Sequence, residues 1–137
     1  MVSLAKTKKN APVYAPEHEL RAFSDGHSTH AWECFGAHAG EQDGVPGYYF
    51  RVWAPNANPL TPVQGGIWEG FIPGLQQYDA YKYAVHTKDG RLTGKADPFA
   101  FHAETRPGTA SKLYDLSGYQ WGDRAWLDYR AKNAPYR

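Results

Sequence analysis

The sequence predicts an all-β protein, an antiparallel β-sandwich with short helices on its N-terminal side and at its C-terminal end. Gly 14 and Pro 10 make up 24 of the 137 residues, which is typical of a chain with many turns and short strands. Aromatic residues reach 15%, and rings favour strands. From Gly47 onward, short segments of alternating hydrophobicity follow one another between turns. The length allows one domain with a real core.

The N-terminal quarter is predicted to contain a flexible tail and two short helices. Residues 1–16 carry several lysines and are interrupted by prolines, so they are expected to be a tail. Residues 19–23 are expected to form one or two helical turns that end near Gly26. A further short helix is expected over residues 29–35, ending at Gly36.

The middle of the chain carries the predicted strands. In the first of them, Tyr48, Phe50 and Val52 alternate with polar and aromatic neighbours, so these three share one face. In the third, Tyr81 and Tyr83 share one face by the same alternation. A Lys88-Asp89-Gly90 turn predicts a hairpin. The predicted strands cover residues 48–54, 66–72, 78–87, 91–93 and 109–116.

A closing helix is predicted from Asp123, as the N-cap residue, through Lys132. Trp126, Leu127 and Arg130 lie at helical spacing within it.

Charge and cysteine content exclude several classes of partner. Lys+Arg 15 and Asp+Glu 14 nearly cancel, so nucleic acid and membrane surfaces are not expected partners. No apolar run is long enough for a bilayer or a signal peptide. A lone Cys34 rules out an intramolecular disulfide and favours a cytoplasmic location.

One set of residues has the composition of a zinc site. If residues 27–38 were helical, His27, His30, Cys34 and His38 would share one face, and imidazole with thiolate suits tetrahedral zinc. Glycines on both sides of this segment favour the alternative, in which these are surface histidines that bind nothing. Cys34 beside histidines has the composition of a thiolate nucleophile, and its alternative is a small buried hydrophobe.

Catalytic residues are otherwise missing. The sequence lacks a Gly-x-Ser-x-Gly elbow and a glycine-rich phosphate loop. Asp97 and Glu104 are the one carboxylate pair considered for acid–base chemistry, and Asp97-Pro98 is also a common turn start. The chain is therefore predicted to hold no catalytic residue, no metal and no cofactor of its own.

The aromatic residues point instead to sugar binding. Flat apolar rings with polar edges suit sugar faces, and neighbouring polar side chains can fix hydroxyl groups. The alternative is that most of these rings belong to the core. The rings in question are Trp32, Tyr49, Trp53, Trp68, Tyr81, Trp121 and Trp126.

Seven short sequence motifs, taken together, narrow the choice of protein family. In chain order they are 35–38 (FGAH), 49–57 (YFRVWAPNA), 66–74 (GIWEGFIPG), 81–83 (YKY), 95–101 (KADPFAF), 106–111 (RPGTAS) and 115–121 (DLSGYQW). In this order they closely resemble the opening of the bacterial glycogen (1,4-α-glucan) branching enzymes. The resemblance covers most of the chain from about residue 20 and is highly specific.

The resemblance implies an immunoglobulin-like (early-set) sandwich, the carbohydrate-binding module of family 48, which precedes a catalytic (β/α)8 barrel. That family makes α-1,6 branches in an α-1,4-glucan by a retaining route that needs two carboxylic residues on the barrel. Those residues lie downstream of the position that matches Arg137, so none is carried over. The implied partners are α-1,4-glucan or glycogen and the barrel.

The resemblance also divides the chain. It implies a tail over residues 1–16, the module over 17–118, and a helical linker toward an absent barrel over 119–137. The family carries an additional strand and an Asn/Trp pair where this chain has only residues 58–65, with Pro59 and Pro62. A module shortened there is expected to bind glucan weakly or not at all.

Two residues are the expected carbohydrate contacts. Lys82 matches the Tyr-Lys-Tyr position from which a lysine can reach a sugar hydroxyl, and its alternative is a solvated strand lysine. Trp68 is a stacking candidate whose alternative is a place in the sandwich core. Trp53 is expected to be buried, against either the barrel or the sandwich core.

Overall fold

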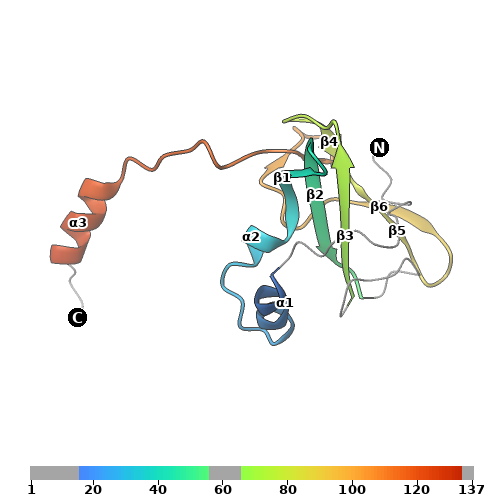
Figure 1. Ribbon diagram of the computed structural model, residues 1–137, viewed down its shortest axis with the longest axis horizontal. Coiled ribbons are helices and arrows are strands. Elements are labelled where there is room, and N and C mark those ends of the chain that lie inside the picture. Colours follow the sequence, from blue (N-terminus) through green and yellow to red (C-terminus); the bar gives the residue numbers. More distant parts are fainter. Residues whose placement is uncertain (1–15, 56–65, 134–137) are drawn as a thin grey trace.

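The computed structural model describes residues 16–55 and 66–133, and this part of the chain forms an antiparallel β-sandwich with short helices (Figure 1). The predicted tail, apart from Pro16, and the shortened stretch 58–65 lie outside the described residues. The first layer is a sheet in the order β1-β2-β3, with all neighbours antiparallel. Its strands are β1 (Gly36–Gln42), β2 (Val45–Trp53) and β3 (Ile67–Pro73).

The second layer is built from shorter antiparallel strands. A sheet in the order β4-β8-β7 lies beside a β5-β6 hairpin, whose turn is the predicted Lys88-Asp89-Gly90 sequence. These strands are β4 (Ala80–Tyr81), β5 (Tyr83–His86), β6 (Leu92–Lys95), β7 (His102–Ala103) and β8 (Ser111–Lys112). The predicted fold class, an immunoglobulin-like all-β sandwich, is confirmed.

The main core lies between the two layers. Tyr48 and Phe50 of β2 pack against Tyr81, Tyr83 and Leu113 of the second layer, and each is at most 6% exposed. The Phe50 and Tyr81 rings meet edge to face with centroids 5.1 Å apart. This arrangement confirms the faces that the alternating patterns predicted for 48–52 and 81–83.

A second core covers the opposite face of the first sheet. The helices α1 (Glu17–Ser24) and α2 (Ala31–Cys34) bring Leu20 and Phe35 onto Ile67 of β3. The Phe35 ring stacks on Phe99, with centroids 5.4 Å apart. The sheet is therefore covered on both faces near the end where the helices pack (Figure 1).

Three details of the predicted elements were wrong. No strand was predicted over 36–42 or 102–103, where the structure has β1 and β7. The predicted strand 78–87 divides at Lys82 into β4 and β5, because β4 pairs with β8 while β5 pairs with β6. The predicted strand 109–116 shortens to β8.

The closing helix α3 (Arg124–Lys132) has the predicted span, but it does not pack on the sandwich. Asp123 occupies the N-cap position without making a side-chain cap hydrogen bond, and none of the helix residues is buried. Figure 1 shows α3 at the far end of an extended segment, well apart from both layers.

Candidate functional site

Asp97 is a buried structural carboxylate rather than an acid–base group at a surface. It is 6% exposed and accepts hydrogen bonds from the Tyr81 hydroxyl at 2.6 Å and the Tyr83 hydroxyl at 3.0 Å. It also accepts one from the backbone N–H of Phe99 at 2.8 Å, while its own N–H donates to Ser111 Oγ at 2.9 Å. Burial raises the pKa of both tyrosines above the ordinary value, and Asp97 raises it further.

Glu104, the other carboxylate considered for acid–base chemistry, closes a loop. Its Oε2 accepts the backbone N–H of Ala110 at 2.9 Å, beside the backbone bond from Glu104 N to the Ala110 carbonyl at 3.0 Å. The hydrogen bonds of Asp97 and Glu104 therefore orient backbone groups and core phenols.

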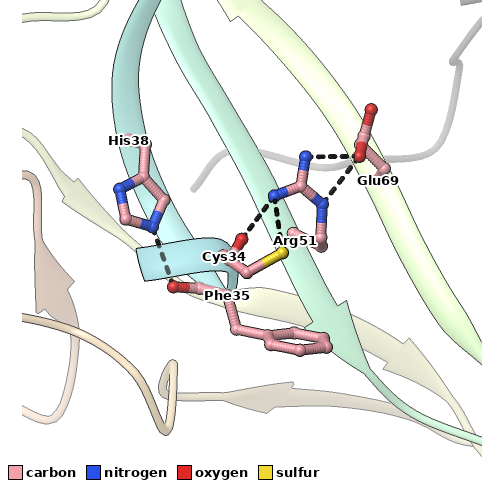
Figure 2. Close-up of polar contacts among 5 residues, drawn as sticks. All are labelled: Cys34, Phe35, His38, Arg51 and Glu69. Carbon is pink, nitrogen blue, oxygen red and sulfur yellow. Dashed lines mark hydrogen bonds and ion pairs between the residues drawn. The ribbon is translucent and has the colours of Figure 1, made fainter. Parts of the chain in front are cut away.

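The predicted zinc residues are separated by the fold. Only residues 31–34 of the segment are helical, and His38 lies in β1. His30 Nδ1 lies 2.9 Å from Thr29 Oγ1, whereas His38 Nε2 lies 2.9 Å from the Phe35 carbonyl oxygen (Figure 2). Within residues 16–55 and 66–133, no group of three or more His, Cys, Asp or Glu could hold a metal ion. The zinc alternative was wrong because the helical face on which it depended does not form.

Cys34 is a buried thiol beside an ion pair that sequence reasoning missed. Arg51 donates to the Cys34 carbonyl and lies 3.6 Å from its Sγ (Figure 2). The same guanidinium pairs with Glu69 Oε2 at 2.6 and 2.7 Å, and both side chains are 7% exposed. Burial raises the pKa of the Cys34 thiol, and Arg51 only partly offsets it. The thiol is therefore kept protonated, which is the opposite of an activated nucleophile.

Lys82 lies on the outer side of the second layer. Its neighbours Tyr81 and Tyr83 turn into the core to reach Asp97, so the alternation along the strand turns Lys82 outward. The Lys82 ammonium donates to Thr109 Oγ1 at 2.6 Å, a contact between exposed groups. Two of its three donor positions remain after that bond.

Trp68 and Trp53 flank the first sheet at the end of β2. Trp68 is partly buried, and its indole N–H donates to the Ala54 carbonyl at 3.0 Å, so only its ring surface remains for other contacts. Trp53 is 52% exposed with its ring edge-on to Phe23, so it is not buried in the sandwich core. Trp68 lies in β3 of the first sheet and Lys82 lies between β4 and β5 of the second layer, so the fold does not join them in one sheet surface.

A surface hollow brings together residues that were not predicted as a site. It lies where α2, β1 and the segment after β8 meet, and Trp32 at its edge is 47% exposed. The sequence does not predict it, because its walls come from four segments up to 85 positions apart (residue 32 to residue 117). Its lining includes Trp32, Glu33, His38, Phe101, Asp115 and Leu116.

No helix in the described part of the chain has the length and apolar character needed to cross a membrane.

Comparison with known proteins gives a match to one family model and to several branching enzymes. Residues 57–100 match the family model of carbohydrate-binding module 48 (isoamylase N-terminal domain). The chain is 44% identical to the 1,4-alpha-glucan branching enzyme GlgB of Synechococcus sp. (strain RCC307), over 82% of this chain and 17% of that protein. It is 41% identical to GlgB of Nitratidesulfovibrio vulgaris (strain DP4), over 88% and 22%.

A further relative matches over nearly the whole chain. GlgB of Desulfitobacterium hafniense (strain Y51) is 39% identical over 96% of this chain and 23% of that protein. The chain spans about a fifth of the length of these curated relatives. By these matches the chain is similar to carbohydrate-binding module 48 and to the matching fifth of the 1,4-alpha-glucan branching enzymes.

Proposed function

We propose that the chain is a non-catalytic module that binds α-1,4-glucan and positions it for a branching enzyme. The observation that carries the proposal is the outward placement of Lys82 between two buried tyrosines. Because Tyr81 and Tyr83 are both held by Asp97, the strand cannot rotate without breaking buried hydrogen bonds, and the Lys82 ammonium is fixed at the surface. The match to carbohydrate-binding module 48 supports a sugar as the ligand.

Lys82 and Trp68 have different roles in this proposal. Lys82 donates to glucan hydroxyls, as it does to the Thr109 hydroxyl in the structure. Trp68 offers only the surface of its ring, because its N–H is occupied by the Ala54 carbonyl. The branching chemistry belongs to the remainder of the enzyme. The lone cysteine and the branching enzyme relatives support a cytoplasmic location for this role.

Affinity electrophoresis in gels with and without glycogen tests the proposal. We expect glycogen to retard the chain and Lys82→Met, which keeps the aliphatic stem, to reduce the retardation. The matched control is Lys88→Met in the β5-β6 turn, which is exposed and should be retarded like the unaltered chain. Equal mobility of the unaltered chain in both gels would refute glucan binding.

One observation favours a second candidate, a structural domain that packs on a catalytic partner. Along the segment from β8 to α3, Leu116, Tyr119, Trp121, Trp126 and Tyr129 are between 43% and 76% exposed. A run of large exposed apolar groups is typical of an interaction surface. If this candidate is right, acrylamide should quench Trp121 and Trp126 in the chain alone but not in a full-length branching enzyme that contains it. Equal quenching in both contexts would exclude it.

A further inference from the structure

We infer that the hollow between α2, β1 and the segment after β8 is a second contact site for an α-glucan chain, separate from Lys82 and Trp68. The class of ligand, an α-glucan, is taken from the proposed function, so the inference rests on that proposal. The location is argued from the residues that line the hollow.

The apolar surface of the hollow is aromatic and partly open to solvent. Trp32 is 47% exposed and stands perpendicular to Phe101, with centroids 6.3 Å apart and a 75° interplanar angle. His38 meets the same Phe101 ring at 5.7 Å and 79°. Because the rings meet edge to face, they do not cover one another in a flat stack. A depression flanked by rings suits the apolar face of a sugar.

Asp115 provides the hollow with a carboxylate held in a fixed orientation. Asp115 accepts the backbone N–H of Ser117 at 2.9 Å and the Ser117 hydroxyl at 2.7 Å, one on each carboxylate oxygen. The bond from the backbone N–H of Ser117 has the larger effect in lowering the pKa of Asp115, and the bond from the Ser117 hydroxyl lowers it further. Asp115 is therefore ionised at neutral pH. Each oxygen keeps further acceptor capacity for a sugar hydroxyl.

His38 adds another acceptor. Its Nε2 faces the Phe35 carbonyl oxygen, which can only accept, so Nε2 carries the proton (Figure 2). In the neutral ring, Nδ1 is then the acceptor. Together with Glu33, the hollow thus offers acceptors to a ligand rich in hydroxyl donors.

The charge of the hollow excludes other ligand classes. Of the described residues that line it, Glu33 and Asp115 are acidic and none is Lys or Arg. A phosphate or carboxylate ligand would therefore be repelled. A neutral polyhydroxylated chain matches both the rings and the acceptors.

The five tryptophans provide a direct test, because each gives one indole N–H resonance by NMR. Single Trp→Phe variants of the 137-residue chain assign the resonances, and maltoheptaose is then titrated. We expect the Trp32 resonance to shift with sugar and the Trp121 resonance, from a ring 76% exposed outside the hollow, to stay.

Two variants measure the contribution of the hollow to glycogen affinity. Trp32→Ala should weaken binding about three- to tenfold, the worth of one aromatic contact. Asp115→Asn keeps the shape of the side chain and should also weaken binding, which guards against a folding defect in the tryptophan variant. Trp121→Ala is the matched control and should bind like the unaltered chain.

The possible outcomes separate this inference from the proposed function. If Lys82→Met weakens binding while the Trp32 resonance stays in place, the hollow is not a glucan site and the proposed function stands. If the Trp32 resonance shifts with protein concentration instead of sugar, the hollow is a contact between copies and the inference is wrong. If no resonance moves and glycogen does not retard the chain, both proposals are wrong.

Discussion

Asp97 is a point in the described core where several hydrogen bonds converge. Two phenols and one backbone N–H converge on a carboxylate that is 6% exposed. A buried charge is tolerated when its hydrogen bonds are satisfied, and here the donors come from three positions along the chain. The residue joins β4 and β5 to the loop before β7, so it determines where Lys82 faces.

Replacing Asp97 should be strongly destabilising. Asp97→Ala leaves the Tyr81 and Tyr83 hydroxyls buried without their acceptor, and each such group costs about 1–3 kcal/mol. We expect the free energy of unfolding, measured by urea titration with tryptophan fluorescence, to fall by about 3 kcal/mol or more. Asp128→Ala, in an exposed pair with Arg124 on α3, is the control and should leave the midpoint unchanged. A midpoint for Asp97→Ala equal to that of the control would contradict this account.

The sequence predicted the tyrosines of this network but not the network itself. Alternation is enough to place Tyr81 and Tyr83 on one face, because side chains in a strand point alternately to the two faces. Alternation cannot pair Tyr81 and Tyr83 with Asp97, which lies 16 and 14 positions away, respectively. That contact depends on the β5-β6 hairpin, which brings Asp97 back to the two tyrosines. The Arg51–Glu69 pair was missed for the same reason, because it depends on the register of β2 and β3.

At the scale of elements, the longer of the two strands that escaped prediction is β1, and the other is β7. The sequence of β1, Gly-Ala-His-Ala-Gly-Glu-Gln, lacks the branched and aromatic residues that mark strands. Small residues are required there because of what lies across from them. A Cβ at Gly40 would stand 2.5 Å from the Tyr49 ring, which occupies the space above β1. The glycine at position 40 is thus dictated by the Tyr49 ring on β2, and a local pattern does not contain that information.

Gly47 lies where the backbones of β2 and β3 approach so closely that a side chain has no space. A Cβ at this position would lie 2.4 Å from the Ile72 carbonyl oxygen and 2.8 Å from the Pro73 Cα. Because these are backbone atoms, they cannot move aside without disturbing the strand pairing. We expect Gly47→Ala to lower the free energy of unfolding by about 1–3 kcal/mol, as measured by urea titration.

The matched control for Gly47 is Gly118→Ala, where an added Cβ would meet nothing within 4 Å. It should be neutral or slightly stabilising, because alanine restricts the unfolded chain more than glycine does. If both variants unfold at the same urea concentration, β2 and β3 do not approach as the structure has them.

At the scale of the whole molecule, the two cores lie on opposite faces of one sheet, and β3 contributes to both through Ile72 and Ile67. Both contain a protonated acid whose pKa is raised by burial: Tyr81 and Tyr83 in the core between the layers, and Cys34 in the core beneath the helices. The closing helix α3 contributes to neither core. The response of the fold to alkaline pH should therefore come from the sandwich and its two N-terminal helices.

The sign of that response follows from proton binding. Above the ordinary tyrosine pKa of about 10, the unfolded chain releases protons that native Tyr81 and Tyr83 retain. The unfolded state then binds fewer protons, so the stability present below that pH is lost as the pH rises. Each of the two tyrosines should remove about 1.4 kcal/mol from the free energy of unfolding per pH unit in this range.

Urea titrations between pH 8 and pH 11 measure this slope, and absorbance at 295 nm reports tyrosinate directly. Tyr83→Phe should make the slope shallower, whereas Tyr129→Phe, whose ring is 67% exposed on α3, should leave it unchanged. Of the ten tyrosines, we expect Tyr81 and Tyr83 to ionise only when the fold is lost, and burial also raises the pKa of Tyr48. If all ten titrated together near pH 10 in the folded protein, the phenols would be open to solvent and Asp97 would not hold Lys82 outward, so the geometry that supports glucan binding would fail with them.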